Sequence, residues 1–123
     1  MENNVLTEKI IGCALEVHKL LGPGLLESIY ESALCIEFEL QGIKFERQKN
    51  IEVTYKNHSI GNFRIDIIVE NQIVLEIKSV ERMDAVFEAQ LLSYMKLGNY
   101  KLGLLLNFNS RLLKDGIKRM ILS

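Results

Sequence analysis

The sequence predicts an α/β protein built on a mixed β-sheet flanked by helices. Helical periodicity dominates the first forty residues, Ile- and Val-rich segments follow over residues 43–80, and a further helix and an apolar strand come after them. The expected order is α-α-β-β-β-β-α-β, followed by a tail of uncertain structure. At 123 residues the chain can bury its own core, so we expect a single domain over residues 1–123.

Two helices open the chain. Apolar residues recur at helical spacing over residues 5–21, and Gly22-Pro23-Gly24 ends this helix because proline cannot continue it. A second amphipathic stripe predicts a helix over residues 25–41, with a glycine as its stop signal.

Three side chains near this helix break are candidates for a site. Glu27 and Tyr30 are three residues apart and therefore project from one face of the second helix. Helix dipoles alone would account for Glu27 at a helix start and for His18 at a helix end.

Strands follow over residues 43–46 and 51–55, with a polar turn at residues 56–58. This segment is the most basic part of the chain, since it contains Lys44, Arg47, Lys49 and Lys56. These residues form either an edge that faces phosphate or the solubilising charges that edge strands commonly carry.

The central stretch, FRIDIIVENQIVLEIKSV at residues 63–80, predicts a β-hairpin with a polar break at residues 70–72. If Val69 faces Ile73 across this break, Asp66 lies directly opposite Glu76, with Cβ atoms roughly 4.5–5.5 Å apart. A two-residue loop would instead send the two carboxylates to opposite faces of the sheet.

Asp66, Glu76 and Lys78 are charges for which an apolar strand has no structural need. Opposed carboxylates repel each other unless a cation lies between them or one is protonated, and a single lysine along the same face is too little to neutralise both. An oxygen-liganded Mg²⁺ or Mn²⁺ is the economical explanation. The alternative is a solvated face on which Lys78 pairs with Glu76. The rest of that face is mostly apolar, which favours a lined cleft: Ile68, Val74 and Val80, with Arg64 at its far end.

A third helix is expected over residues 83–97, where Gln90 and Tyr94 lie four residues apart on one face. The apolar run YKLGLLLNF at residues 100–108 suits a buried, parallel strand. A short element of uncertain type is expected over residues 116–122.

Composition limits the classes of function. A net charge of −1 lacks the basic excess of proteins that bind nucleic acid tightly, so a polyanion would need a local patch, a metal or a partner. Cys13 and Cys35 have no metal-ligand spacing and are expected to be reduced, buried thiols. No apolar run is long enough for a membrane and no leader opens the chain, so a cytoplasmic location is the default. A small-molecule enzyme finds no support, because there is no phosphate loop, nucleophile motif or cofactor fingerprint.

Asp66 followed by Glu76-Ile77-Lys78 resembles the D…(D/E)xK signature of the PD-(D/E)XK nuclease superfamily. Glu27 corresponds to a helical glutamate that precedes the hairpin in many members, and Gln90-x-x-x-Tyr94 resembles the QxxxY motif of the RecB-like exonuclease branch. The element order also matches the αβββαβ core of this restriction-endonuclease-like fold. The sequence departs from the superfamily name before Asp66, where Ile65 replaces proline.

A closer resemblance is to the GxxExxY family, a small bacterial branch of the superfamily. Residues 24–30, GLLESIY, carry the naming motif, and the segments EVHKLLGPGLLESIYESAL, VLEIKSV, AQLLSYMKLG and GLLLNF also resemble that family. The resemblance covers nearly the whole chain but implies no defined substrate.

The resemblance implies a metal-dependent nuclease, a hydrolase of phosphodiester bonds, with DNA favoured over RNA. Mg²⁺ or Mn²⁺ would be held by Asp66, Glu76 and the Ile77 backbone carbonyl, and by Glu27 directly or through water.

The same resemblance implies roles for side chains around the metal. Lys78 would orient the attacking water and offset charge in the transition state, and Gln90 and Tyr94 would position water or the scissile phosphate. The further candidates for contacting phosphate or supporting the ligands are Arg64, His18 and Tyr30. A homodimer or a partner protein is open, as is the alternative of a nuclease-fold binding or assembly module with little or no catalysis.

Overall fold

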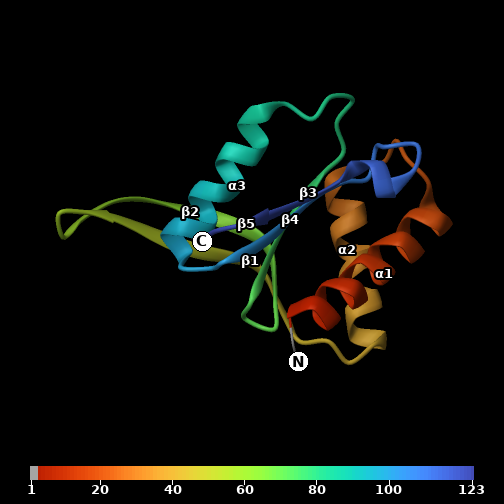
Figure 1. Cartoon of the computed structure of the whole chain (residues 1–123), viewed down its shortest axis with the longest axis horizontal. Coiled ribbons are helices and arrows are strands. Elements are labelled where there is room, and N and C mark those ends of the chain that lie inside the picture. The colour runs from red at the N-terminus through yellow and green to blue at the C-terminus, as the bar shows by residue number, and fades with distance from the viewer. Residues whose placement is uncertain (1–2) are drawn as a thin grey trace.

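The structure is a computed structural model that describes residues 3–123, and its helices and strands form a five-stranded sheet with helices on both faces (Figure 1). The elements in chain order are α1 (Asn3–Leu21), α2 (Glu27–Leu40), β1 (Phe45–Tyr55), β2 (His58–Val69), β3 (Ile73–Lys78), α3 (Ala85–Gly98), β4 (Leu102–Asn107), the 3-10 helix η1 (Leu113–Gly116) and β5 (Ile117–Ile121). No helix within these residues has the length and apolar character needed to cross a membrane.

The strands lie in the order β1-β2-β3-β4-β5. β3 and β4 are parallel, with Ile73 beside Leu102, and the other neighbouring pairs are antiparallel. α3 is the crossover between the two parallel strands. Every residue of β4 is buried, because both of its faces are covered, and the expected buried parallel strand is confirmed.

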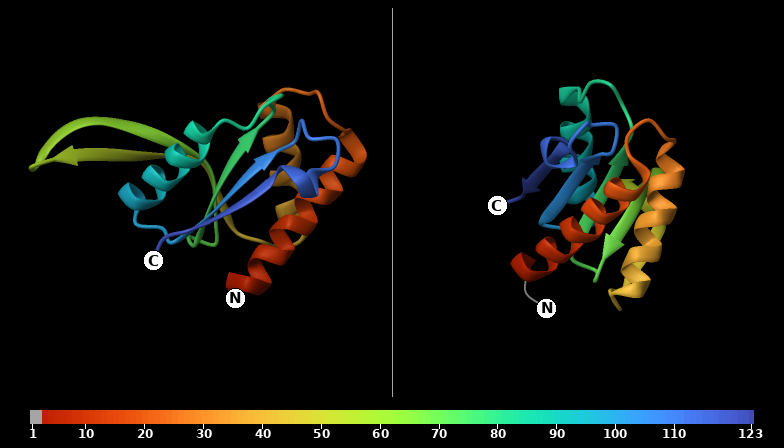
Figure 2. Two further views of the ribbon diagram at one scale, coloured as in Figure 1. Left: turned by 45° about the horizontal axis from the view of Figure 1, so that its top comes forward. Right: turned by 90° about the vertical axis from the view of Figure 1, so that its right-hand side faces the viewer.

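Helices cover both faces of the sheet, α1 and α2 on one face and α3 on the other (Figure 2), and alternate residues of β2 and β3 pack against them. On one face, Ile67 and Leu75 belong to a core shared with α1 and α2. On the other face, Ile68 and Val74 belong to a second core built with α3. Both cysteines are free and buried in the first core, as expected.

The predicted hairpin register is confirmed. Val69 pairs with Ile73, and the next two pairs, Ile68 with Val74 and Ile67 with Leu75, continue the same register. The polar break supplies the tight turn, in which Glu70 and Asn71 take φ angles of 51° and 54°.

The predicted strand count needs two corrections. The strands expected over residues 43–46 and 51–55 are one strand, β1, because the polar residues between them stay paired with β2 on both sides of Gln48. The uncertain tail contains η1 and a fifth strand, β5, which pairs with β4 and covers its outer edge. The observed order is therefore α-α-β-β-β-α-β-η-β, and the α/β mixed sheet itself is confirmed.

β1 and β2 are interrupted where Gln48 faces Asp66. Gln48 has a φ angle of 53°, and the pairing resumes in the same register with Lys49 beside Ile65. The alternation of faces breaks here, since Ile65 packs on the α3 side but Ile67 packs on the α1 and α2 side. Beyond this point the two strands continue as a ribbon that projects from the sheet (Figures 1 and 2). We call residues 49–64 the arm.

Candidate active site

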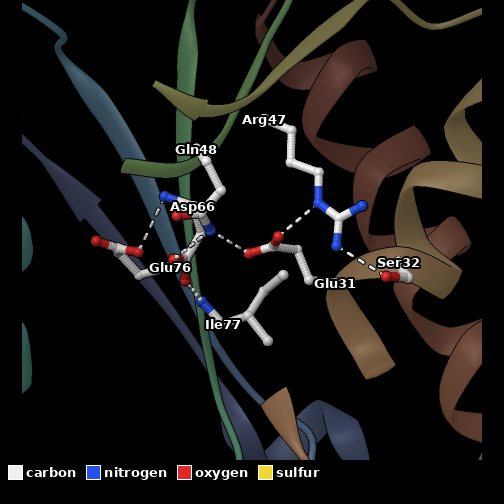
Figure 3. Close-up of polar contacts among 7 residues, drawn as sticks. All are labelled: Glu31, Ser32, Arg47, Gln48, Asp66, Glu76 and Ile77. Atoms are coloured by element: carbon white, nitrogen blue, oxygen red, sulfur yellow. Dashed lines mark hydrogen bonds and ion pairs between the residues drawn. The ribbon is translucent and has the colours of Figure 1, made fainter. Parts of the chain in front are cut away.

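Two carboxylates meet where β2 leaves β3. The strand pairing stops at Ile67 and Leu75, and at the next step side chains take over the bonding between the strands. The Ile77 N–H donates a hydrogen bond to Asp66 Oδ2 at 2.8 Å. The Asp66 N–H donates a longer one, at 3.4 Å, to Glu76 Oε2 (Figure 3). The register that was required to bring Asp66 opposite Glu76 is therefore the one observed.

Glu76 is the buried member of this pair. Only 6% of its surface is exposed. Burial first, and then the hydrogen bond and charge of Asp66, raise the pKa of Glu76 from 4.5 to about 9, although the charge of Lys78 acts in the opposite direction. A positive charge placed between the two carboxylates would relieve this penalty.

Lys78 and Tyr94 lie beside the carboxylates on the α3 side of the sheet. The Lys78 ammonium lies 4.7 Å from the centroid of the Phe87 ring, where a cation–π contact holds it. Tyr94 stacks on Phe63 with a centroid distance of 4.2 Å. Burial and the nearby charges of Glu76 and Asp66 raise the pKa of the Tyr94 hydroxyl, so this hydroxyl belongs to the same electrostatic environment. Gln90 is exposed one turn before Tyr94 on α3.

Glu27 lies at the start of α2, next to the residue that follows Lys78. The Ser79 N–H donates to Glu27 Oε2 at 3.4 Å, and the Ser79 hydroxyl donates to the Leu25 carbonyl at 2.6 Å. Glu27 therefore borders the end of β3, but it does not join the two carboxylates: within residues 3–123 no group of three or more Asp, Glu, His or Cys side chains is placed to hold a metal.

Tyr30 is placed in the core and holds the loop in front of Glu27. It is fully buried and stacks on Phe108 with a centroid distance of 4.6 Å. Its hydroxyl donates to the Gly22 carbonyl and accepts the Leu25 N–H. The two ends of the glycine-proline loop are thereby tied to α2.

His18 and Arg64 are placed away from these contacts. His18 Nε2 donates to the Ser110 carbonyl at 2.8 Å, at the end of α1. Arg64 is exposed on the arm, where it pairs with Asn50 across the ribbon. The structure thus brings Asp66, Glu76, Lys78 and Tyr94 together, puts Glu27 at their border, and gives His18 and Arg64 other neighbours.

A chain of side chains that the sequence did not reveal fixes Asp66 (Figure 3). Gln48 Nε2 donates to Glu31 Oε1 at 2.8 Å and lies 3.4 Å from Asp66 Oδ1. Glu31 is buried, and its other oxygen lies 2.6 Å from Arg47 Nε, while Arg47 also donates to Ser32. The interruption at Gln48 turns its amide towards the carboxylates of Glu31 and Asp66. Glu31 on α2 therefore holds the orientation of Asp66 through Gln48 of β1.

The one sequence signal for this series of hydrogen-bonded side chains is the position of Glu31, one helical turn after Glu27 on the same face of α2. Nothing in the strand pattern distinguishes Arg47 and Gln48 from ordinary polar residues of an edge strand.

The donor set fits a hard divalent cation. Asp66 and Glu76 offer carboxylate oxygens on facing strands, and a backbone carbonyl and water would complete the shell. Mg²⁺ commonly binds in this way, through one or two carboxylates together with water and substrate phosphate. The groups that contact the Asp66 carboxylate, the Gln48 amide and the Ile77 N–H, bring no sulfur or imidazole, the ligands that would indicate zinc.

A family model described as the PD-(D/E)XK nuclease superfamily matches residues 4–120. Searches of curated proteins and of solved structures find no match to the chain. PD-(D/E)XK nucleases generally use divalent metal ions and act on nucleic acid, which agrees with the paired carboxylate oxygens described above. Since the match extends over almost the whole chain and the fold agrees with it, the protein belongs to the PD-(D/E)XK nuclease superfamily.

Proposed function

We propose that this protein is a Mg²⁺- or Mn²⁺-dependent nuclease that hydrolyses phosphodiester bonds in DNA, and that it is a member of the GxxExxY branch. The observation that carries the proposal is the Asp66–Glu76 pair, in which a buried carboxylate faces a second one and shares its surroundings with Lys78. A structural role alone would not require two carboxyl groups so close that one of them is held in its protonated form, beside a half-buried lysine.

The ligands of the cation would be Asp66, Glu76 and the Ile77 carbonyl, with Glu27, at the border of the site, acting through water. When bound, the cation would act as a Lewis acid towards a phosphate oxygen and neutralise developing charge. The hydrogen bond from the Ile77 N–H leaves Asp66 fixed in orientation, so that few side chains need to reorganise on binding.

The remaining side chains act on water and phosphate. The Lys78 ammonium orients the attacking water and offsets negative charge on the phosphorus oxygens in the transition state. Gln90 and Tyr94, one turn apart on α3, position that water or the scissile phosphate. Attack forms a bond from the water oxygen to phosphorus while the bond to the leaving sugar oxygen breaks; the water gives up one proton to solvent, and the leaving sugar oxygen takes one up from solvent.

A cleavage panel tests the proposal. Single-stranded DNA, duplex DNA and RNA are each incubated with the protein and Mg²⁺ or Mn²⁺. We expect cleavage of DNA that needs the metal and falls by at least about a hundredfold in Asp66→Asn and Lys78→Ala. Glu8→Gln removes an exposed carboxylate from α1 and is expected to cut like the wild type.

Cleavage that persists in Asp66→Asn, in a preparation free of contaminating nuclease, would contradict the assignment of Asp66 and its neighbours as the catalytic site. Failure of the wild type to cut any substrate, together with failure to bind metal, would favour the nuclease-fold binding or assembly module.

A further inference from the structure

The arm extends far beyond the part of the sheet that the helices cover. Residues 54–62 at its end are all exposed, and only its base contributes half-buried residues to the core. An isolated two-stranded ribbon is at best marginally stable in water, so the projecting part of the arm adds little to the stability of the folded protein. A projecting element of this kind is better explained by a partner that it contacts.

The base of the arm is continuous with the candidate active site. Phe63 on the arm stacks on Tyr94, and the strand that forms this edge of the arm runs three residues further to Asp66. A ligand held along the arm is therefore directed to the carboxylates. The nine residues from Asp66 to the turn at Asn57 span roughly 30 Å, or about nine base steps of duplex DNA.

The arm carries the basic excess that the whole chain lacks. Its basic residues are Lys49, Lys56 and Arg64 and its acidic residue is Glu52, a net charge of +2 in a chain of −1, which leaves −3 for the rest. Lys49, at the base, pairs with Glu46 at 3.4 Å, so Lys56 and Arg64 are the charges that project with the arm. This charge separation matches a polyanion whose affinity comes from phosphate neutralisation.

The tip adds groups suited to contact with bases and sugars. Tyr55 is 59% exposed and Ile60 is 62% exposed. The Lys56 ammonium lies 5.4 Å from the centroid of the Tyr55 ring. Tyr55 therefore lies beside a cation near the tip of the ribbon, and Ile60 is a second exposed apolar side chain in the same part of the arm.

The face of the arm turned away from α3 presents hydrogen-bonding side chains. Asn50 pairs with Arg64 and Glu52 pairs with Asn62 across the ribbon, and all four are exposed. Arginine and asparagine are the side chains that read guanine and adenine edges in the major groove. That groove, about 12 Å wide in B-form DNA, admits a two-stranded ribbon, whereas the major groove of A-form RNA is too narrow for side chains to read.

We propose that the arm lies in the major groove of duplex DNA and holds the duplex against the Asp66–Glu76 site; this inference rests on the proposed nuclease function. A second copy of the chain is the weaker occupant, because two arms of charge +2 repel each other and the exposed apolar groups at the tip are few.

The test measures binding of a labelled DNA duplex of about 20 base pairs, twice the span of the arm. Asp66→Asn protein is used throughout so that the duplex is not cut. The arm variant also carries Lys56→Ala and Arg64→Ala, and the matched control carries Lys19→Ala and Lys114→Ala, which remove the same charge from exposed positions near the end of α1 and in η1. Tyr55→Ala is a third protein, altered only at the exposed tip.

We expect the arm variant to bind about tenfold or more weakly at low salt, with the slope of log K against log salt reduced by about 2. The control should bind like Asp66→Asn alone, and Tyr55→Ala should weaken binding without changing the slope. Thermal unfolding confirms that each variant is folded.

Equal binding by the arm variant and the control would overturn the role of the arm, and wild-type cleavage of the same duplex would show that the nuclease proposal still stands. Absence of both binding and cleavage on every nucleic acid would remove both proposals. Tighter arm-dependent binding of an RNA duplex, or a dimer that Tyr55→Ala converts to a monomer with DNA binding unchanged, would assign the arm to a different partner.

Discussion

Asp66 and Glu76 differ in how the fold treats their charges. Asp66 accepts the Ile77 N–H and lies next to the Gln48 amide, so its carboxylate is supported by donors. Glu76 is buried against Asp66, and the main contributions to its pKa favour the protonated form. The cost of keeping two carboxylates together therefore falls mainly on Glu76.

This difference predicts how the stability of the metal-free protein depends on pH. In the unfolded chain Glu76 ionises near 4.5, but in the folded protein it holds its proton up to about 9. The folded state therefore binds more protons between these values, and the free energy of unfolding falls as the pH rises through this window. Thermal unfolding in the presence of a chelator, from pH 5 to pH 9, measures this fall.

Glu76→Gln keeps the shape of the side chain but removes its charge. We expect this variant to match the wild type at pH 5 and to be more stable at pH 8, while Mn²⁺ at pH 8 stabilises the wild type alone. If the free energy of unfolding changed with pH in the same way for the two proteins, Glu76 would ionise in the folded protein without loss of stability, contrary to the burial observed.

At the scale of single residues, the sequence predicted the central pair on the condition of a three-residue turn, because that turn and strand alternation together place Asp66 opposite Glu76; the two-residue turn that would have separated them is not the one observed. It could not predict the contact of Gln48 with Glu31 and Asp66. That contact depends on the interruption of β1 and on the position of α2 above the sheet, neither of which follows from local pattern.

α3 is held on the sheet by close contact with β4, and this contact sets the position of Gln90 and Tyr94. Gly103 of β4 faces the helix, and a Cβ added there would lie 2.7 Å from Met95 Sδ and 3.2 Å from a methyl group of Leu91. The helix approaches the strand so closely because the strand has no side chain at this point.

Gly103→Ala is therefore expected to lower the free energy of unfolding by about 1–3 kcal/mol through overpacking. It should also reduce cleavage, because α3 must move and carries Tyr94 with it. Gly12→Ala is the matched control: its Cβ meets nothing within 4 Å and lies inside α1, where alanine is favoured over glycine by roughly 0.5–1 kcal/mol. Urea unfolding of both variants measures the difference, and a stabilised Gly103→Ala would contradict the packing described.

The helices, the central hairpin and the parallel strand were all predictable because each has a strong local period or turn signal. β1 was divided in two because residues 47–50 are polar, and polarity resembles a loop when the paired strand is out of view. β5 is short and partly exposed, and its pairing with β4 alone makes it a strand.

On the scale of the whole molecule, the candidate site lies where three parts meet. α2 supplies Glu27 and, through Glu31 and Gln48, the orientation of Asp66. The sheet supplies the carboxylates, and α3 supplies Tyr94. The arm leaves the body at this junction, so the proposed DNA-binding surface and the candidate site share one region of the fold (Figure 1).

The fold class was predictable at this scale from the order of elements, but the projection of the arm was not. Both strands of the arm continue strands of the sheet. Their sequence alone gives no sign that the helices cover only the inner part of these strands. The basic segment was visible in the sequence, and the structure places two of its four basic residues, Lys49 and Lys56, on the projecting ribbon.

The most direct measurement is titration of the metal-free protein with Mn²⁺ by calorimetry at pH 8, with Asp66→Asn, Glu76→Gln and the control Glu8→Gln treated in parallel. We expect the wild type and Glu8→Gln to bind Mn²⁺ with release of a proton, because Glu76 must ionise to become a ligand, and the two site variants to bind much more weakly. Equal Mn²⁺ binding by all four proteins, or none by the wild type, would contradict a metal centre at Asp66 and Glu76.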